Sequence, residues 1–216
     1  MSGRDAVGPA EIRHEIEQAM QAIGLLSKPG MLGQFADFVA LLIKWNQTYN
    51  LTAIRDTSAI VSAHLLDSLV IAPFLLGDRG IDVGSGAGFP GIPLAIALPE
   101  RRITLLDSSQ KKTAFLRQAV ADLKLENVEV VCARAESWAP DRAYDWVVSR
   151  ALADLALFAA SAAHLASPTG VLAAMKGAYP ETEIAELPPA FRVREVVRLR
   201  VPGLDAERHL VLIGPQ

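Results

Sequence analysis

A glycine-rich segment constrains the fold of this chain more than any other feature. Residues 81–91 read Ile-Asp-Val-Gly-Ser-Gly-Ala-Gly-Phe-Pro-Gly, which predicts a strand, a glycine turn and a helix that starts near Pro90. Glycine adopts positive φ and lets a ligand approach the main chain closely. In this order, the three elements form a nucleotide-type site at the carboxyl end of a parallel sheet.

The spacing of the glycines narrows the choice of ligand. A dinucleotide-binding loop has the form G-x-G-x-x-G, and its third glycine would fall at Phe89. The glycines instead lie at 84, 86 and 88 and follow Asp82, a pattern similar to the S-adenosylmethionine loop of class I methyltransferases. Four glycines within residues 84–91 argue against a turn that binds nothing.

An acidic residue downstream supports the same type of ligand. The apolar run 103–106 ends in Asp107, 23 residues after Gly84, where a second strand would present a carboxylate to ribose hydroxyls. The alternative role for Asp107 is a helix cap, because Ser108, Ser109 and a helical stretch follow it. Since the spacing and the loop agree, we favour the ribose role.

The composition limits the class of protein. A chain of 216 residues, 51% of them hydrophobic, can bury a substantial core and fits one domain plus an extension. Cys132 is the only cysteine, which excludes an internal disulfide and suits the cytoplasm. The first residues lack the apolar core of a signal peptide, and the apolar run 69–76 is too short to span a bilayer. With a net charge of −3, nucleic-acid binding requires a local basic patch or a shaped pocket.

The first third of the chain is expected to be helical. Apolar residues at helical spacing predict helices over 9–26, 31–49 and 57–74. We therefore expect a helical N-terminal extension over residues 1–75 and a second domain over 76–216.

In the second domain, apolar strands alternate with helices, which predicts a mostly parallel sheet. Strands are expected near 80–83, 102–106, 127–131, 144–149 and 170–175, and helices near 90–98, 109–124 and 154–165. Two more runs, near 192–201 and 208–213, predict an antiparallel pair that closes the sheet. The predicted fold class is α/β: a Rossmann-like class I methyltransferase with a mostly parallel seven-stranded sheet.

Further polar residues follow predicted strands and therefore face the ligand crevice. For the segment Arg134-Ala135-Glu136, the alternatives are contact with an adenine ring and an ordinary polar loop. Arg150 holds a carboxylate or a phosphate, or forms a surface ion pair. Lys176 contacts an RNA phosphate or is a solvated lysine at a strand end.

Four arginines alternate along the run near the end of the chain and are expected on one face of a strand: Arg192, Arg194, Arg198 and Arg200. Such a stripe can follow a phosphate backbone. We favour the commoner alternative, the solvated face of an edge strand.

Several chemical devices are missing. The fourth strand is followed by Ser149-Arg150-Ala151 and not by the N/D-P-P-Y/F loop of enzymes that methylate exocyclic base amines. Base-carbon methylation needs a cysteine nucleophile, but Cys132 is expected to be a small core residue. The histidines are scattered, and we expect no metal site. Guanine N7 has a free lone pair, so methyl transfer to it needs positioning more than a general base.

From about residue 30 onward, the chain resembles the bacterial 16S rRNA guanine-N7 methyltransferase G family, also called glucose-inhibited division protein B. The resemblance is carried by the glycine loop with residues 89–93 and by the segments 44–46, 49–52, 55–56, 64–68, 104–108, 115–117, 176–177 and 207–211.

The resemblance implies S-adenosylmethionine as the methyl donor and one guanosine of 16S rRNA in the small ribosomal subunit as the acceptor. It implies no defined general base. We also expect a cytoplasmic monomer that acts without a membrane. Cofactor contacts are implied at Gly84, Phe89, Ala135, Glu136 and Arg150, and the ribose argument adds Asp107.

The role of three residues in the family segments stays open. One possible role is to line the base pocket, and the other is to tie the helical extension to the sheet through buried hydrogen bonds. We favour the second role for all three residues: Asn46, Asn50 and His64.

Three other functions are weighed against the methylation of rRNA. A small-molecule methyltransferase is disfavoured by the missing base and metal site, and an rRNA-binding or assembly factor without activity by the intact loop. A nicotinamide dehydrogenase is disfavoured by Phe89 at the third glycine position.

Overall fold

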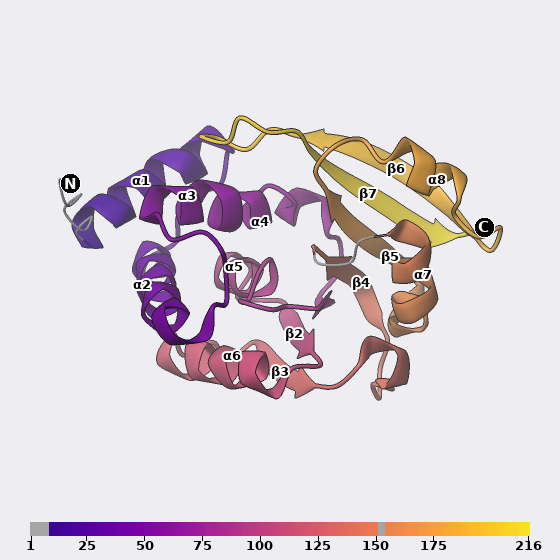
Figure 1. Ribbon diagram of the computed structural model, residues 1–216, viewed down its shortest axis with the longest axis horizontal. Coiled ribbons are helices and arrows are strands. Elements are labelled where there is room, and N and C mark those ends of the chain that lie inside the picture. The colour runs from indigo at the N-terminus through magenta and orange to yellow at the C-terminus, as the bar shows by residue number, and fades with distance from the viewer. Residues whose placement is uncertain (1–8, 151–153) are drawn as a thin grey trace.

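The computed structural model describes residues 9–150 and 154–216, and within them seven strands form one sheet (Figure 1). Its order is β3-β2-β1-β4-β5-β7-β6. The strands are β1 (Arg79–Val83), β2 (Arg102–Asp107), β3 (Val128–Cys132), β4 (Tyr144–Ser149), β5 (Ala166–Lys176), β6 (Phe191–Leu199) and β7 (Arg208–Pro215). The mostly parallel seven-stranded sheet is confirmed.

The strand order creates a switch point at the centre of the sheet. The chain proceeds outward from β1 to β3 and then returns to place β4 on the other side of β1, with all these pairs parallel. Strand β7 is antiparallel to both β5 and β6, so the predicted antiparallel pair is confirmed. Open α/β sheets bind ligands at the carboxyl ends of the strands beside such a switch point.

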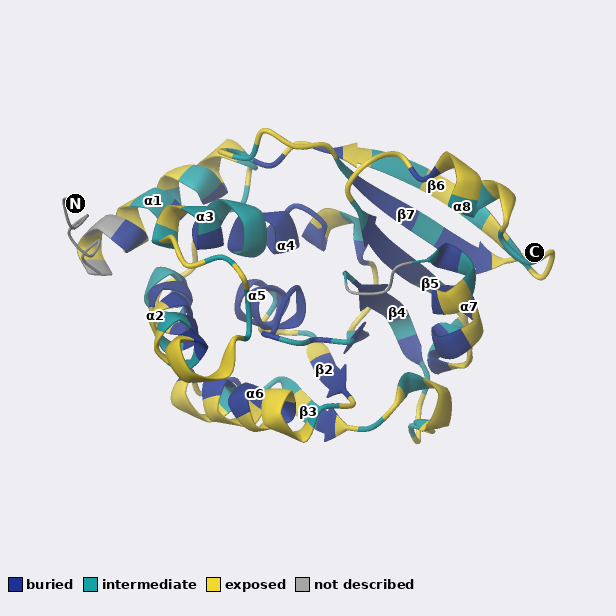
Figure 2. Ribbon diagram, in the orientation of Figure 1, coloured by how far each residue is buried: buried dark blue, intermediate teal, exposed yellow. Residues whose placement is uncertain are grey.

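Helices cover both faces of the sheet (Figure 1). On one face lie α1 (Pro9–Ala22), α2 (Met31–Tyr49), α5 (Gly91–Ala97) and α6 (Gln110–Asp122), and on the other lie α7 (Leu155–Ala162) and α8 (Glu181–Ala185). The inward sides of α1, α2, α5, α6 and α7 are buried, whereas α8 has no buried residue (Figure 2). Helices α1 and α2 share one apolar cluster with α5 and α6, and the domain boundary at residue 75 stays a prediction.

The stretch predicted as one helix over 57–74 is broken into several turns. It comprises α3 (Thr57–Ile60), the π-helical η1 (Val61–Leu66), α4 (Asp67–Leu69) and the 3₁₀ turn η2 (Ala72–Phe74). Pro73 in η2 has no N–H group, which accounts for the end of the α-helical ladder before it. A π turn is common at functional sites, and here it contains His64 and directly precedes Asp67.

By length and composition alone, the stretch Thr57–Phe74 is apolar enough to cross a membrane, but half of it is buried inside the protein. Ile60, Leu65 and Leu69 belong to the apolar core. Asp67 within the stretch forms ion pairs with residues of the sheet domain. These contacts are those of a core helix.

Some element boundaries differ from the sequence predictions. Helix α1 ends at Ala22, four residues early, because Gly24 has a φ of 74° and the N–H of Leu25 returns to the carbonyl of Met20. Strand β5 begins at Ala166, earlier than expected, and α8 was not predicted. Helix α8 has only five residues, too few to show a helical period.

The expectation that four arginines share one strand face is wrong. A β-bulge between Val193 and Glu195 shifts the register of β6 against β7 by one residue. Because side chains alternate along a strand, Arg192 lies on the face of Gly214, and Arg198 lies with His209 on the opposite face. All four arginines are exposed, and β6 is an edge strand of the described sheet.

Replacing two glycines by alanine should change the free energy of unfolding in opposite directions. A Cβ at Gly80 would lie 2.0 Å from the ring of Trp146, a fully buried side chain, so Gly80→Ala should lower the free energy of unfolding by about 1–3 kcal/mol. A Cβ at Gly33 in α2 meets no atom within 4 Å, so Gly33→Ala should raise it by about 0.5–1 kcal/mol. Urea unfolding of both variants measures these changes. Equal effects of the two substitutions would contradict the packing described here.

Candidate functional site

The glycine turn after β1 has the backbone conformation that its sequence predicts. Gly84, Gly86 and Gly88 have φ values of 74°, 57° and 90°, in the left-handed region. The N–H groups of Gly84 and Ser85 donate to the carbonyl of Leu106, at 2.8 and 3.1 Å. The loop is therefore fixed to the end of β2.

Asp82 lies beneath this loop and is completely buried. Its Oδ2 accepts the N–H of Gly91 at 2.9 Å, at the start of α5, and its Oδ1 has no hydrogen-bond partner among the described residues. Burial raises the pKa of Asp82 to about 7, against the hydrogen bond from Gly91. A Cβ at Gly91 would lie 2.8 Å from Oδ2, so the close approach of the carboxylate needs a glycine there.

Asp107 ends β2 and connects the loop to α6. Its Oδ2 accepts the N–H of Gly86 at 2.9 Å, and its Oδ1 accepts the N–H of Ser109 at 2.8 Å. The ammonium group of Lys112 lies 3.8 Å from Oδ2. The N-cap of α6 is Ser109, whose Oγ accepts the N–H of Lys112, so the helix-cap role proposed for Asp107 belongs to Ser109.

One cleft of about 250 Å³ brings most of the predicted cofactor residues together. Gly84, Asp107, Ala135 and Glu136 all line it, although they follow three different strands. Ala135 and Glu136 belong to the 3₁₀ turn η3 (Ala135–Ser137) after β3. The cleft lies at the carboxyl ends of β1, β2 and β3, where a parallel sheet places its ligands.

Phe89 and Arg150 do not line this cleft and instead form a second cluster next to the glycine loop. The Phe89 side chain is buried, and the guanidinium of Arg150 lies 5.2 Å from the centre of its ring. The imidazole of His64 packs 4.8 Å from the same ring. Ala151, the last residue of the segment after β4, lies outside the described residues.

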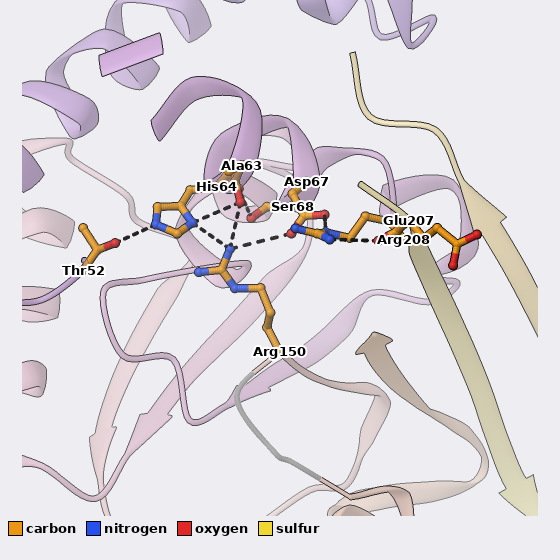
Figure 3. Close-up of polar contacts among 8 residues, drawn as sticks. All are labelled: Thr52, Ala63, His64, Asp67, Ser68, Arg150, Glu207 and Arg208. Atoms are coloured by element: carbon orange, nitrogen blue, oxygen red, sulfur yellow. Dashed lines mark hydrogen bonds and ion pairs between the residues drawn. The ribbon is translucent and has the colours of Figure 1, made fainter. Parts of the chain in front are cut away.

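Arg150 is held by polar groups from the helical N-terminal segment (Figure 3). Its Nη1 donates to His64 Nδ1 at 3.0 Å and lies 3.8 Å from Asp67 Oδ2. Asp67 also accepts a hydrogen bond from Arg208 Nε at 3.0 Å, so one buried carboxylate joins two guanidinium groups. Burial raises the pKa of Asp67, and Arg208 and Arg150 oppose that rise; burial also lowers the pKa of Arg150.

The histidine in this cluster is neutral. Nδ1 of His64 lies 3.0 Å from both Arg150 Nη1 and the carbonyl oxygen of Ala63, and Nε2 lies 2.8 Å from Thr52 Oγ1. Burial, and next the charge of Arg150, lower the pKa of His64 to about 4.

The family segments of unclear role tie the extension to the sheet. The amide of Asn46 donates to the carbonyl of Thr52 at 2.9 Å and accepts its N–H at 3.0 Å, and Thr52 in turn contacts His64. Asn50 has a φ of 50° and ends α2. These contacts support the structural role that we favoured for Asn46 and His64.

Two strand-end residues differ from their sequence predictions. Lys176 is not a solvated lysine: its side chain is 11% exposed, and its ammonium lies 2.6 Å from Glu183 Oε2 on α8. Cys132 is exposed and not a core residue, because the edge strand β3 leaves it uncovered. Within the described residues, no group of three or more His, Cys, Asp or Glu side chains is arranged to hold a metal ion.

Asp67 and Arg208 belong to the cluster around Arg150 but were not among the predicted site residues. Asp67 was detectable, because a carboxylate within the apolar run 65–71 must be paired if the run is buried. Its partners come from residues 150 and 208, and no local pattern reveals such distant contacts.

The pKa of His64 offers a direct test of this cluster. In NMR titration, the imidazole should titrate near pH 4, and Arg150→Gln should raise this pKa while leaving it below 6.5, because burial is the larger cause. In the unfolded chain this pKa is about 6.5, so the unfolded state gains a proton at a higher pH than the folded state does. The contribution of His64 to the free energy of unfolding is therefore fully present above pH 6.5 and is lost as the pH falls through about 4. A wild-type pKa near 6.5 would contradict the arrangement in Figure 3.

Comparison with solved structures shows the fold. A SAM-dependent methyltransferase from Aquifex aeolicus matches with a TM-score of 0.59 at 17% sequence identity, covering 81% of this chain and 97% of that one. TrmN from Thermus thermophilus matches with a TM-score of 0.51 at 20% identity, covering 72% and 53% of the two chains. The Rossmann-like class I methyltransferase fold is confirmed.

Comparison of sequences shows the family. The family model described as rRNA small subunit methyltransferase G matches residues 31–211. A protein named Ribosomal RNA small subunit methyltransferase G from Laribacter hongkongensis is 51% identical over 94% of this chain and 98% of its own length. Its namesake from Chromobacterium violaceum is 50% identical over 91% of this chain and 95% of its own length. The chain therefore belongs to the rRNA small subunit methyltransferase G family.

Proposed function

We propose that the protein transfers a methyl group from S-adenosylmethionine to N7 of one guanosine in the 16S rRNA of the small ribosomal subunit. The observation that carries the proposal is the convergence of Gly84, Asp107 and Glu136 on one cleft. Relatives that are about half identical over nearly the whole chain carry the name of a methyltransferase of small-subunit ribosomal RNA.

The residues of the cleft fit this cofactor. Each carboxylate oxygen of Asp107 accepts one main-chain N–H, which leaves a lone pair on each for ribose hydroxyls. A Cβ placed at Gly86 would meet only the carbonyl oxygen of Gly84, at 3.7 Å, so the main chain there is open to close approach. Ala135 and Glu136 would address the adenine ring through an N–H group and a carboxylate.

The second cluster would complete the cofactor site on the other side of the loop. Arg150 carries a positive charge beside Phe89 and uses only its Nη1 in hydrogen bonds with described residues. Its remaining N–H groups suit the carboxylate of the cofactor. Beneath the loop, the buried Oδ1 of Asp82 has no hydrogen-bond partner among the described residues.

Bound S-adenosylmethionine supplies a methyl group on a positively charged sulfur, and the chain's own residues have to align the acceptor with it. Guanine N7 is unprotonated, so no side chain has to remove a proton before transfer. The neutral His64 is engaged by Arg150 and Thr52 and is not free to act as a base. Alignment then accounts for most of the rate enhancement.

The remaining parts of the proposal follow from this reaction. Lys176, at the end of β5, would lie near the RNA, with its charge oriented by Glu183. The protein would act in the cytoplasm as a monomer, without a metal ion and without a membrane.

The glycine loop offers a matched pair of variants. Gly84 and Gly24 both have a φ of 74°, so an aspartate at either position has to adopt a φ in the left-handed region, and only Gly84 lines the cleft. Gly84→Asp should lower the affinity for S-adenosylmethionine at least about 100-fold, because a carboxylate would occupy the space for the ligand, whereas Gly24→Asp should not change it. Isothermal titration calorimetry measures both. Unchanged affinity in Gly84→Asp would refute the assignment of the loop.

Transfer of a labelled methyl group tests the acceptor. Unmodified 16S rRNA or small subunits should become labelled, whereas 23S rRNA and free guanine nucleotides in the same reaction should not. Label in the nucleotides would favour a small-molecule methyltransferase. Cofactor binding without any transfer would favour an assembly factor.

A further inference from the structure

We propose that Tyr49, Lys111 and Lys112 form an RNA-contacting rim that holds nucleotides next to the target guanosine. This inference rests on the proposed function, since it assumes that the substrate is RNA. The three residues lie where the end of α2 meets the start of α6, helices that are packed side by side (Figure 1). Lys112 lines the cleft of Gly84 and Asp107, so the rim borders the proposed cofactor site.

The charges on this rim are not explained by the stability of α6. Lys111 and Lys112 are in its first turn, which contains no acidic residue. The positive end of the helix dipole disfavours cations at this position, so two lysines there weaken the helix. In a chain of net charge −3, two adjacent cations at an unfavourable position indicate a use outside the fold.

The two lysines differ in how far their charges are already compensated. Lys112 has Asp107 at 3.8 Å, but that carboxylate also accepts two main-chain N–H groups. Among the side chains that the structure describes, no carboxylate lies within 4.0 Å of the ammonium group of Lys111. Lys111 is exposed and rests 5.1 Å from the centre of the Tyr49 ring. Its charge is therefore available to a phosphate.

An aromatic side chain lies beside these charges. Tyr49 is 39% exposed, and its ring stacks 4.9 Å from that of Trp45, which in turn packs edge-on against buried Phe115. The ring is thus fixed by the core and has little conformational freedom to lose on binding. Fixed aromatic rings beside cations are the combination with which proteins hold single-stranded RNA, by stacking on bases and pairing with phosphates.

The arginines of β6 do not offer an equivalent surface. The β-bulge puts Arg192 and Arg198 on opposite faces of the strand, and Arg198 pairs with Glu207 at 3.5 Å. Strand β6 runs parallel to β5, so Arg192 at the start of β6 lies at the amino ends of the parallel strands. The cleft lies at the opposite, carboxyl ends. Arg192 is exposed and has no ion pair among the described residues, which makes it a matched control for Lys111.

The test is a charge reversal at each position, Lys111→Glu and Arg192→Glu. An acidic residue is favoured at a helix N-terminus, so Lys111→Glu should not unfold α6. We expect it to weaken binding of unmodified 16S rRNA about tenfold and to lower the salt dependence of that binding by about one phosphate contact, with unchanged affinity for S-adenosylmethionine. Arg192→Glu should leave both affinities unchanged, and Lys111→Arg should restore RNA binding. Fluorescence anisotropy over a salt series measures the RNA affinities.

The aromatic part of the rim has its own conservative control. Tyr49→Ala should weaken RNA binding at least threefold, and Tyr49→Phe, which keeps the ring, should bind as the wild type does. The thermal midpoint of each variant shows whether the fold is intact.

The outcomes separate this inference from the proposed function. If the wild type methylates 16S rRNA and Lys111→Glu binds RNA no more weakly than Arg192→Glu, the rim does not contact RNA, and the proposed function stands. If Lys111→Glu methylates naked 16S rRNA normally but fails on small subunits, the rim contacts a ribosomal protein, and the RNA assignment is wrong. If the wild type methylates no rRNA, the proposed function fails, and the binding measurements still decide whether the rim contacts RNA.

Discussion

The carboxylate of Asp107 joins three elements on which the proposed cofactor site depends. Its two oxygens accept the N–H groups of Gly86 in the glycine loop and Ser109 at the start of α6, while Asp107 itself ends β2. Each bond is made by a charged acceptor, which makes it stronger than a bond between neutral groups. The backbone conformation of the loop therefore depends on this side chain as well as on its glycines. Asp107 thus holds the glycine loop and the start of α6 together at the cleft.

A second constraint comes from the helical N-terminal segment, which is part of the site and not only a cover for the sheet. The π turn contains His64 and directly precedes Asp67, and both residues hold Arg150 at the end of β4. Thr52 holds His64 from the opposite side, and Asn46 fixes Thr52. This chain of contacts links α2 to the sheet through buried and partly buried polar groups, which cost free energy when unpaired. A change at residue 46 is thus expected to reach Arg150 through the intervening side chains.

The sequence predicted those parts of the structure that depend on residue type at fixed spacing. The glycine loop and Asp107 are of this kind, because positive φ and a carboxylate after a strand are needed at set positions. Apolar runs that alternate with helices likewise predicted the sheet, because the buried positions of its strands require apolar residues.

Other features depend on contacts or shifts that leave no local signal. The faces of the β6 arginines could not be predicted, since a single bulge reverses the alternation after Val193. Helix α8 is too short to show a period, and it supplies Glu183 to Lys176, which changed the environment expected for that lysine. The bond between His64 and Arg150 joins residues 86 positions apart, a pairing that a single sequence does not reveal.

The proposed mechanism is that alignment in this cleft directs a methyl group to guanine N7 and to no other atom. Its most direct test is to methylate unmodified small subunits with the protein and to map the product in 16S rRNA by borohydride reduction and aniline cleavage, which cut the chain at N7-methylguanosine. We expect one cleavage site, which should be absent when Gly84→Asp replaces the wild type. Methylated 16S rRNA that resists cleavage would show a different acceptor atom and would refute transfer to N7.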